Sequence, residues 1–450
     1  MTPTPIDRLL ECRWVVPVEP AGVVLEDHAI AIEGGRIRDV LPIDVARTRY
    51  AADDVVRLPD HAVTPGLVNA HTHAAMTLLR GVGDDLPLMR WLQERIWPLE
   101  GKLVSERFVY DGTRLAAHEM LRAGITCCSD MYFFPEAAAA ALRSVGMRCA
   151  TGIIVIEFPS AYATDADDYL RKGLAMRDRF KDDPLVSFTL APHAPYTVSD
   201  ATFTRVATLA EELDLPIHMH VHETSDEIDK SLAQHGVRPL ERLERLDLVT
   251  ERLVAVHAVH LDDAEIALLA QRGASVAHCP ASNLKLASGI ARVAALSAAG
   301  VNVALGTDGA ASNNRLDLLA DMRLAALLAK GASGDPAALP AAEALACATL
   351  NGARALGLDH AIGSIVIGKQ ADLCAFDLSQ VETQPVFDAL SHLVYACSRE
   401  SVTNVWIAGE PVVQMRQAVH RGRELDLTQA MAAMGAWQNQ IRQFLDAQRP

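Results

Sequence analysis

His71 and His73 are the residues whose types and spacing first suggest chemistry. They end the run Pro65-Gly66-Leu67-Val68-Asn69-Ala70-His71-Thr72-His73, in which Pro-Gly predicts a turn leading into a short apolar strand. Residues at i and i+2 on a strand point to the same side, so both imidazoles can reach one metal ion. The pair alone is weak support for a metal site, because other structural roles account for many such pairs.

Further candidate ligands share one feature, a position at or near the end of a predicted apolar strand. They are His218, His220 and His222 within 215–224, His257 and His260 within 253–260, and Asp308 within 301–309. The three histidines of the first segment alternate with apolar residues and share a face, but not all three can be ligands. Taken singly, His220 or His257 is better explained as a buried core histidine, and Asp308 as a cap of the next helix. Together, in ascending order at strand ends, they predict one mononuclear metal site.

This order of residues resembles the amidohydrolase superfamily, whose members are metal-dependent hydrolases on a (β/α)8 barrel. The resemblance implies these roles: His71 and His73 as first-strand ligands, His220 as the fifth-strand ligand, His257 beside the metal water, and Asp308 as the eighth-strand ligand. His220 is preferred over its neighbours because the family places a glutamate three residues later, here Glu223. Members with two metals usually carry a carboxylated lysine on the fourth strand; segment 186–193 has no lysine, so one metal is expected.

Ligands of this kind accept a divalent metal and leave a position for water. Zinc is the favoured ion, although iron and manganese suit the same histidine and aspartate ligands. A bound divalent metal lowers the pKa of water from about 16 toward about 7. Asp308 can accept the proton of that water, and His257 can hold the water or stabilise a developing alkoxide.

Glu223 is not needed as a metal ligand and is therefore free for acid–base chemistry. A carboxyl group beside the metal can protonate a ring nitrogen, which makes the neighbouring carbon of an aromatic amidine electrophilic. This predicts hydrolytic deamination of a heterocycle. The structural alternative is that Glu223 caps a helix beginning near Thr224.

Within the superfamily, the chain is most similar to the deaminases of 5'-methylthioadenosine and S-adenosylhomocysteine, with triazine hydrolases and guanine deaminases nearby. The similarity runs over nearly the whole chain and is clearest in the sequence motifs at residues 69–100, 192–196 and 306–314. It implies a purine nucleoside as the small-molecule substrate, whose 6-amino group is released as ammonia. The implied substrate contacts are Glu100, on the ribose hydroxyls, together with His193, Trp91 and Ser312. Structural alternatives are a surface residue for Glu100, a turn-stabilising role for His193 and a core position for Trp91.

The region expected after the third strand, residues 156–168, departs from one pattern of that group. Members that handle S-adenosylhomocysteine well tend to carry arginines there, because a guanidinium pairs with the amino-acid carboxylate. Here the region is acidic and apolar. We therefore expect 5'-methylthioadenosine to be preferred over S-adenosylhomocysteine, with adenosine as a further substrate.

Two alternative functions remain open from the sequence. A hydrolase of another aminated or chlorinated ring, such as an s-triazine or guanine, would use the same metal site. A non-catalytic metal-binding barrel is the alternative from a different class, which the complete ligand set disfavours. The cytidine-type zinc deaminases are excluded because their Pro-Cys-x-x-Cys signature is absent.

Composition indicates a large enzyme that does not bind polyanions. The net charge of -16 argues against nucleic acid as a partner, since phosphate neutralisation needs clustered Lys and Arg. We see no signal peptide and no apolar run of the roughly 18 residues that a membrane span needs. Eight cysteines without Cys-x-x-Cys spacing favour reduced thiols in a cytoplasmic protein. The family resemblance implies a homodimer or homotetramer.

The pattern of elements predicts two structural units. Residues 65–363 alternate apolar strands with helical runs such as 107–123 and 200–213, as in a (β/α)8 barrel. Residues 1–64 and 364–450 are rich in short strands and turns, including a hairpin with a Gly-Gly turn at 29–37. In the superfamily such segments join in a small β-sandwich domain. The last run, 427–447, predicts an amphipathic helix for packing or an oligomer contact, because it has few basic residues for a membrane surface.

Overall fold

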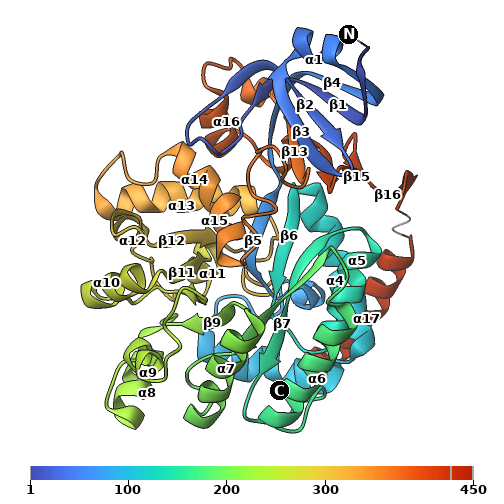
Figure 1. Cartoon of the computed structure of the whole chain (residues 1–450). Coiled ribbons are helices and arrows are strands. Elements are labelled where there is room, and N and C mark those ends of the chain that lie inside the picture. Colours follow the sequence, from blue (N-terminus) through green and yellow to red (C-terminus); the bar gives the residue numbers. More distant parts are fainter. Residues whose placement is uncertain (1, 426–427, 448–450) are drawn as a thin grey trace.

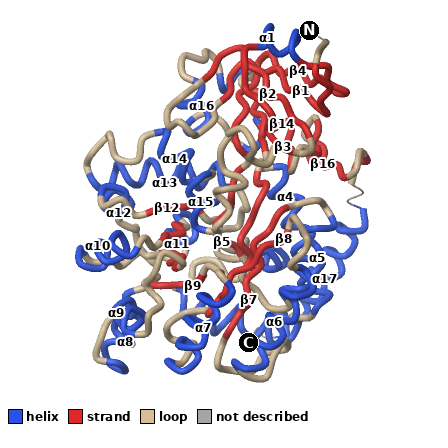
Figure 2. The backbone as a smooth tube through the Cα atoms, viewed as in Figure 1, coloured by secondary structure: helices blue, strands red, loops and turns tan. Residues whose placement is uncertain are grey.

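Eight short, almost wholly buried parallel strands form the larger part of this computed structural model, which describes residues 2–425 and 428–447 (Figures 1 and 2). In hydrogen-bonding order they are β5 (Leu67–Thr72), β6 (Ile125–Asp130), β7 (Arg148–Val155), β8 (Val186–Pro192), β9 (Ile217–Val221), β10 (Leu253–His257), β11 (Ser275–His278) and β12 (Asn302–Leu305). Asp308 N donates to His71 O (3.0 Å), which joins the segment after β12 to β5. This is the predicted (β/α)8 barrel, in which the carboxyl ends of all strands meet on one face.

Helical structure follows every barrel strand. The helices are α4 (Glu106–Arg122), α5 (Pro135–Ser144), α6 (Ala166–Phe180), α7 (Asp200–Leu213), α8 (Ser225–His235), α9 (Pro239–Arg245), α10 (Asp263–Arg272), α11 (Pro280–Lys285), α12 (Val293–Ala298), α13 (Leu318–Ser333), α14 (Ala341–Cys347) and α15 (Leu350–Ala355). Ser105 and Ser199 cap α4 and α7, because each hydroxyl accepts a backbone N–H of the first turn. The helices predicted at 107–123 and 200–213 are therefore confirmed within one residue.

The segment between β5 and α4, residues 74–103, contains several short helices and is called the excursion below. It consists of a 3-10 helix η1 (Ala74–Leu79), α2 (Leu88–Trp91), a π-helical turn η2 (Leu92–Ile96) and α3 (Trp97–Leu103). Buried apolar side chains of this excursion, including Leu79, Ile96 and Leu99, pack in one cluster with Phe108 of α4. The excursion therefore provides a wall beside the strand ends that no barrel strand supplies.

The two ends of the chain share one nine-stranded sheet above the barrel. Its order is β17 (Arg423–Glu424), β16 (Gln417–His420), β15 (Glu410–Gln414), β14 (Val402–Ile407), β13 (Leu373–Asp377), β4 (Tyr50–Pro65), β1 (Thr4–Val15), β2 (Leu25–Glu33) and β3 (Arg36–Pro42). Short helices accompany it: α1 (Ile43–Arg49), η3 (Val381–Thr383), α16 (Ala389–Tyr395) and η4 (Arg399–Ser401). The N- and C-terminal segments meet where β13 pairs with β4.

Local sequence explains much of this sheet. Gly34 and Gly35 have φ of 58° and 74°, the left-handed backbone that the predicted β2–β3 hairpin turn requires. Alternate residues of β2 enter different apolar clusters, with Ile30 and Ile32 in one and Ala29 in the other. The predicted unit boundaries, 64/65 and 363/364, fall at the end of β4 and in the loop between α15 and β13.

A buried ion pair ties the sheet to the barrel. Arg148 of β7 donates through Nε to Asp372 Oδ2 (2.8 Å) and through a terminal nitrogen to Asp372 Oδ1 (3.2 Å). Asp372 Oδ1 also accepts from Ala408 N (2.7 Å). Removing one partner of such a pair costs about 3–5 kcal/mol, because the other charge is left buried. This ion pair therefore stabilises the contact between the barrel and the sheet.

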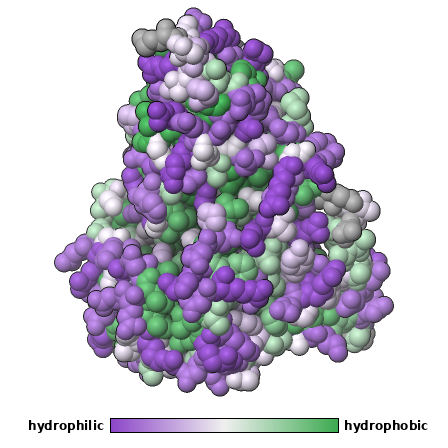
Figure 3. Space-filling model, turned by 45° about the vertical axis from the view of Figure 1, so that its right-hand side comes forward, coloured by the Kyte–Doolittle hydropathy of each residue, from purple (hydrophilic) through white to green (hydrophobic). Residues whose placement is uncertain are grey.

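The last helix, α17 (Thr428–Ala447), lies against the barrel beside α4 (Figure 1). Trp437 packs edge-on to Phe108 (ring centroids 5.2 Å apart), and its Nε1 donates to Asp111 Oδ2 (3.0 Å). The helix was predicted to begin at residue 427, which lies outside the described residues. Its apolar face thus packs within the same chain. None of the described helices is long and apolar enough to cross a membrane. On the face of the molecule shown in Figure 3, hydrophilic side chains dominate, with apolar patches between them.

Candidate metal centre and substrate pocket

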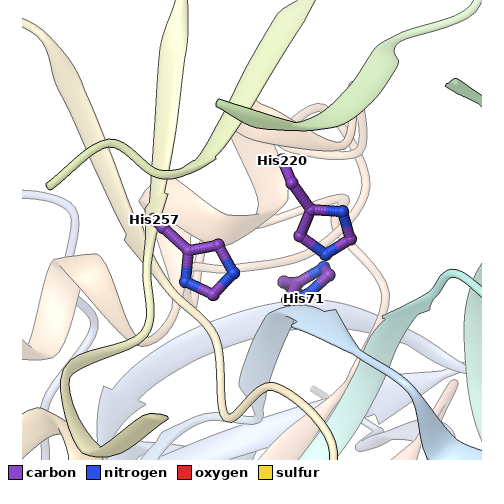
Figure 4. A group of neighbouring side chains, drawn as sticks. All are labelled: His71, His220 and His257. Carbon is purple, nitrogen blue, oxygen red and sulfur yellow. The ribbon is translucent and has the colours of Figure 1, made fainter. Parts of the chain in front are cut away.

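The predicted ligands come together at the carboxyl ends of the barrel strands. His71 lies on β5, His220 on β9 and His257 at the end of β10, and their rings converge in Figure 4. His73 and Asp308 follow β5 and β12. Ligand atoms of His71, His220 and His257 lie within 4.8 Å of one another, as do those of His71, His73 and Asp308. Strands far apart in sequence thus deliver one compact set of nitrogen and oxygen donors.

A second partner fixes the orientation of each of these imidazoles. His73 Nδ1 donates to Met131 O (2.5 Å), His220 Nδ1 to His193 O (2.7 Å) and His257 Nδ1 to Asn283 Oδ1 (2.8 Å), while His71 Nδ1 lies 3.1 Å from His218 Nε2. A carbonyl acceptor requires the proton to sit on Nδ1, which leaves the Nε2 lone pair for a ligand. This is the usual support of metal-binding histidines.

The donor set fits a divalent metal ion. His71 Nε2 is buried and has no hydrogen-bond partner of ordinary geometry among the described residues, although Asp308 Oδ1 lies 3.4 Å away. Burial lowers the pKa of His71 to about 4 and holds the pKa of His220 well below its usual value, so both rings are neutral at pH 7. Neutral imidazole is the form that binds a metal, and an unpartnered buried lone pair is otherwise costly.

Asp308 is ionised and tightly held. Burial acts to raise its pKa, but interactions with the neighbouring His71, His73 and His257 hold that pKa well below its ordinary value. Its Oδ2 accepts from Ser282 Oγ (2.6 Å) and Ser312 Oγ (2.7 Å), and its Oδ1 lies 3.3 Å from His73 Nε2. Ser312, predicted as a substrate contact, therefore lies behind Asp308 and is not part of the pocket lining.

Two of these residues have strained backbone. His257 has φ of 70° and Asp308 has φ of 57°, in the left-handed region that favours glycine. Each such residue costs of order 1–3 kcal/mol and persists where the surroundings over-determine it. Both lie at strand ends facing the metal centre, so the strain coincides with the candidate site.

A pocket of about 340 Å³ opens onto the metal centre. Its polar lining consists of His73, His193, His220, Glu223, His257 and Asp308 around the candidate metal centre, together with Glu100, Tyr132, Ser160 and Tyr196. The other walls are mainly apolar, with Trp91, Leu92 and Ile96 on one side and Ile156 and Phe158 after β7. Such a pocket, apolar with a few converging polar groups, suits a small flat ligand.

Glu223 faces the metal centre and does not cap the following helix. Its Oε2 lies 3.7 Å from His257 Nε2, and its Oε1 accepts from Ser288 Oγ (3.5 Å). Burial raises the pKa of Glu223, which favours the protonated form. The cap of α8 is Thr224, whose hydroxyl accepts from Glu227 N. Glu223 is therefore placed to give a proton to a bound ligand.

His193 and the excursion residues complete the pocket. His193 Nδ1 lies 3.1 Å from Thr197 Oγ1, and burial lowers its pKa to about 3. Trp91 is 5% exposed, and Glu100 Oε1 accepts from the Tyr132 hydroxyl (2.6 Å). Burial raises the pKa of Glu100 to about 7. Of the ten predicted site residues, the pocket lining includes all but His71, which is fully buried, and Ser312.

The structure also places the histidines that the sequence left open. His218 bridges His71 and Ser129, whose Oγ lies 2.9 Å from His218 Nδ1. His222 Nε2 accepts from Leu240 N (3.1 Å), and His260 Nε2 donates to Ser288 O (2.7 Å). None of the three lines the pocket.

Sequence reasoning missed the supporting residues Asn283 and Tyr132. Asn283 follows β11 in the run His278-Cys279-Pro280-Ala281-Ser282-Asn283, and Tyr132 follows β6. Tyr132 comes shortly after β6 and Asn283 lies on α11, the short helix that follows β11, at the end of the barrel where polar side chains are expected to face the active site. Their position close after barrel strands was the feature of the sequence that could have identified them.

Comparisons with known proteins place the chain in a known family and fold. A model described as the amidohydrolase family matches residues 62–412. A "5-methylthioadenosine/S-adenosylhomocysteine deaminase" of Teredinibacter turnerae is 46% identical over 94% of this chain and 95% of its own. The crystal structure of an adenosine deaminase from Xanthomonas campestris with bound zinc has a TM-score of 0.96 and 53% identity, covering 98% of this chain and 100% of that one. An atrazine chlorohydrolase of Arthrobacter aurescens, complexed with zinc, has a TM-score of 0.87 at 24% identity, with 96% and 99% covered, and supports the fold alone.

Proposed function

The chain belongs to the amidohydrolase family, and from that premise we propose that it is a zinc-dependent deaminase of adenine nucleosides, with 5'-methylthioadenosine as preferred substrate. The reaction replaces the 6-amino group of the purine with oxygen from water and releases ammonia. The observation that carries the proposal is one pocket lined by two carboxyl groups, Glu223 beside the candidate metal ligands and Glu100 on α3 of the excursion.

His71, His73, His220 and Asp308 are the residues that would hold the zinc ion. When bound, zinc is a Lewis acid that lowers the pKa of water toward neutrality. Asp308 accepts a proton from the attacking water, because its carboxyl group is ionised and its Oδ2 is fixed by two serines. His257 is held by Asn283, which keeps its Nε2 directed at the site. These residues orient water and take its proton.

Glu223 supplies the other proton that the reaction needs. It donates to a ring nitrogen next to the carbon under attack, which makes that carbon electrophilic. After water has added, the proton taken up by Asp308 passes to the amino group, and the C–N bond breaks to release ammonia. The hydroxyl proton of the adduct returns to Glu223, so the ring retains the oxygen as a carbonyl and both carboxyl groups are restored. The raised pKa of the Glu223 carboxyl matches a general acid that must be protonated when substrate arrives.

Glu100 is proposed to accept hydrogen bonds from the ribose hydroxyls, and the apolar wall after β7 is proposed to receive the 5' substituent. That wall includes Ile156, Phe158 and Pro159, and none of the described residues lining the pocket is Arg or Lys. A thioether methyl is compatible with such a surface, whereas the amino-acid carboxylate of S-adenosylhomocysteine would lack a cationic partner. This supports 5'-methylthioadenosine over S-adenosylhomocysteine.

The test is an ultraviolet assay of zinc-analysed protein with 5'-methylthioadenosine, adenosine, S-adenosylhomocysteine and guanine, combined with ammonia release. We expect chelator-sensitive turnover with the highest kcat/KM for 5'-methylthioadenosine. A kcat/KM for S-adenosylhomocysteine that equals or exceeds the kcat/KM for 5'-methylthioadenosine would contradict the proposed preference. No turnover of any nucleoside by zinc-loaded protein would overturn the nucleoside assignment and direct the assay to s-triazines.

A homodimer or homotetramer and a cytoplasmic location stay predictions of the sequence. Sedimentation velocity of the zinc-loaded protein tests the first, and fractionation of the source cells tests the second. A monomer at all concentrations would contradict the predicted oligomer.

A further inference from the structure

The π-helical turn η2 sets which residues of the excursion face the pocket. On a regular α-helix, side chains three or four positions apart share a face, so the face of Leu88 and Trp91 would continue at Arg95. The wider turn at Leu92–Ile96 takes up one additional residue. As a result Ile96 and Glu100 line the pocket, and Arg95 is exposed. The turn therefore brings a carboxylate to a wall that is otherwise apolar.

Tyr132 is the polar anchor of that carboxylate. Its hydroxyl donates to Glu100 Oε1 over 2.6 Å, and within the described parts of the chain Glu100 has no second side-chain partner. Burial raises the pKa of Tyr132 well above its ordinary value, so the hydroxyl keeps its proton and remains a donor. The other carboxylate oxygen of Glu100 is left for a ligand in the pocket that both residues line.

Tyr132 is itself fixed to the metal centre through its neighbour in sequence. Met131 O accepts from Nδ1 of the predicted ligand His73 (2.5 Å), and Met131 N donates to Thr72 O (3.0 Å). One short backbone segment after β6 thus contacts the metal-binding strand β5 on one side and, through Tyr132, Glu100 on the other. The position of Glu100 is coupled to that of the metal ligands.

We propose that Tyr132 is a positioning residue that holds the Glu100 carboxylate in a fixed place relative to the candidate metal ligands, ready to accept a ribose diol. The inference rests on the proposed function, in which Glu100 accepts the ribose hydroxyls. A carboxylate fixed in advance loses little side-chain freedom on binding, so the diol is recognised more strongly. Tyr132 therefore sets selectivity for nucleosides that carry both hydroxyls, without taking part in the deamination step.

The test compares Tyr132→Phe with wild type on adenosine and on 2',3'-dideoxyadenosine, which lacks the diol. We expect KM for adenosine to rise about tenfold, because a charge-assisted hydrogen bond is lost. We expect kcat to stay within about threefold and KM for the dideoxy analogue to stay near wild type. The matched control is Tyr50→Phe, which removes a tyrosine hydroxyl bonded to a carboxylate (Asp39 Oδ2, 3.1 Å) in the small sheet.

A second measurement separates positioning from a general packing defect. In a Glu100→Gln background, Tyr132→Phe should add no further rise in KM for adenosine, since both changes act on one interaction. Fully additive effects, or equal rises in KM for adenosine and its dideoxy analogue, would overturn the inference. Wild-type protein without activity on any nucleoside would instead overturn the proposed function, and the inference with it.

Discussion

The end of the pocket at the candidate metal ligands and the end proposed to bind ribose, called the metal end and the ribose end below, are built in opposite ways. At the metal end, side chains come from strands of one barrel, and each histidine has a second partner that fixes its ring. At the ribose end, the wall is a helical excursion held by apolar packing, with Glu100 fixed by Tyr132. The comparison suggests that the barrel fixes the chemistry, while the excursion and the loop after β7 fix the choice of substrate.

The largest expected effect comes from removing a ligand at the metal end. His220→Ala deletes a nitrogen donor, so bound zinc and kcat should both fall, kcat by at least about a thousandfold. Zinc analysis and the ultraviolet assay measure the two effects. The control is His392→Ala on α16, since His392 lies outside the pocket; this variant should keep wild-type zinc content and kcat. Full activity of the metal-depleted variant would refute the role of this end.

Next in size is the loss of the proton donor. Glu223→Gln removes the acid but no proposed ligand, so kcat should fall about 10²- to 10⁴-fold while zinc content is unchanged. The neighbouring exposed residue on α8 offers the control Asp226→Asn, with wild-type kcat expected. An unchanged kcat in Glu223→Gln would assign the proton transfer to another group.

A smaller effect is expected where a partner of the metal end is removed. Asn283→Ala deprives His257 Nδ1 of its acceptor, and kcat/KM should fall about 10- to 100-fold with zinc retained. Asn283→Asp keeps an acceptor oxygen and should recover part of the activity. If the aspartate variant is as impaired as the alanine variant, orientation of His257 is not the cause.

The ribose end should show its own pH dependence. Because burial raises the pKa of Glu100 to about 7, the carboxylate that accepts the hydroxyls is lost as pH falls below that value. We expect kcat/KM for adenosine to decrease by up to about tenfold per pH unit below 7, a decrease that should be absent in Glu100→Gln. The same acid limb with 2',3'-dideoxyadenosine would place the titrating group at the metal end.

The smallest effect concerns the wall after β7. Phe158 is 46% exposed at the pocket, so an arginine there has room to meet the carboxylate of S-adenosylhomocysteine. Phe158→Arg should lower KM for S-adenosylhomocysteine about threefold, as exposed ion pairs are weak, and leave 5'-methylthioadenosine unimproved. Phe158→Leu is the uncharged control. If Phe158→Arg and Phe158→Leu lower KM for S-adenosylhomocysteine equally, the cause is the change in side-chain size and not the added charge.

The sequence alone predicted the barrel and the candidate ligands, and its resemblance to the family implied that the two terminal segments join. Apolar strands have a strict period of two, so His71 and His73 on one strand had to share a side. Strand ends of a parallel barrel meet on one face, so His257 and Asp308 could be expected beside them. Both rules depend on local periodicity, which a sequence displays directly.

Only the tertiary structure decided which side chains support the chemistry. Periodicity could not separate His218 from His220, because both occupy one face of β9; packing put His218 behind His71. The roles of Ser312 and Tyr132 likewise depend on contacts in the folded chain. Ser312 donates to Asp308, and Tyr132 donates to Glu100. Such contacts depend on how loops of different length return to the strand ends. Local pattern does not encode that geometry, whereas packing and the need to pair buried polar groups impose it.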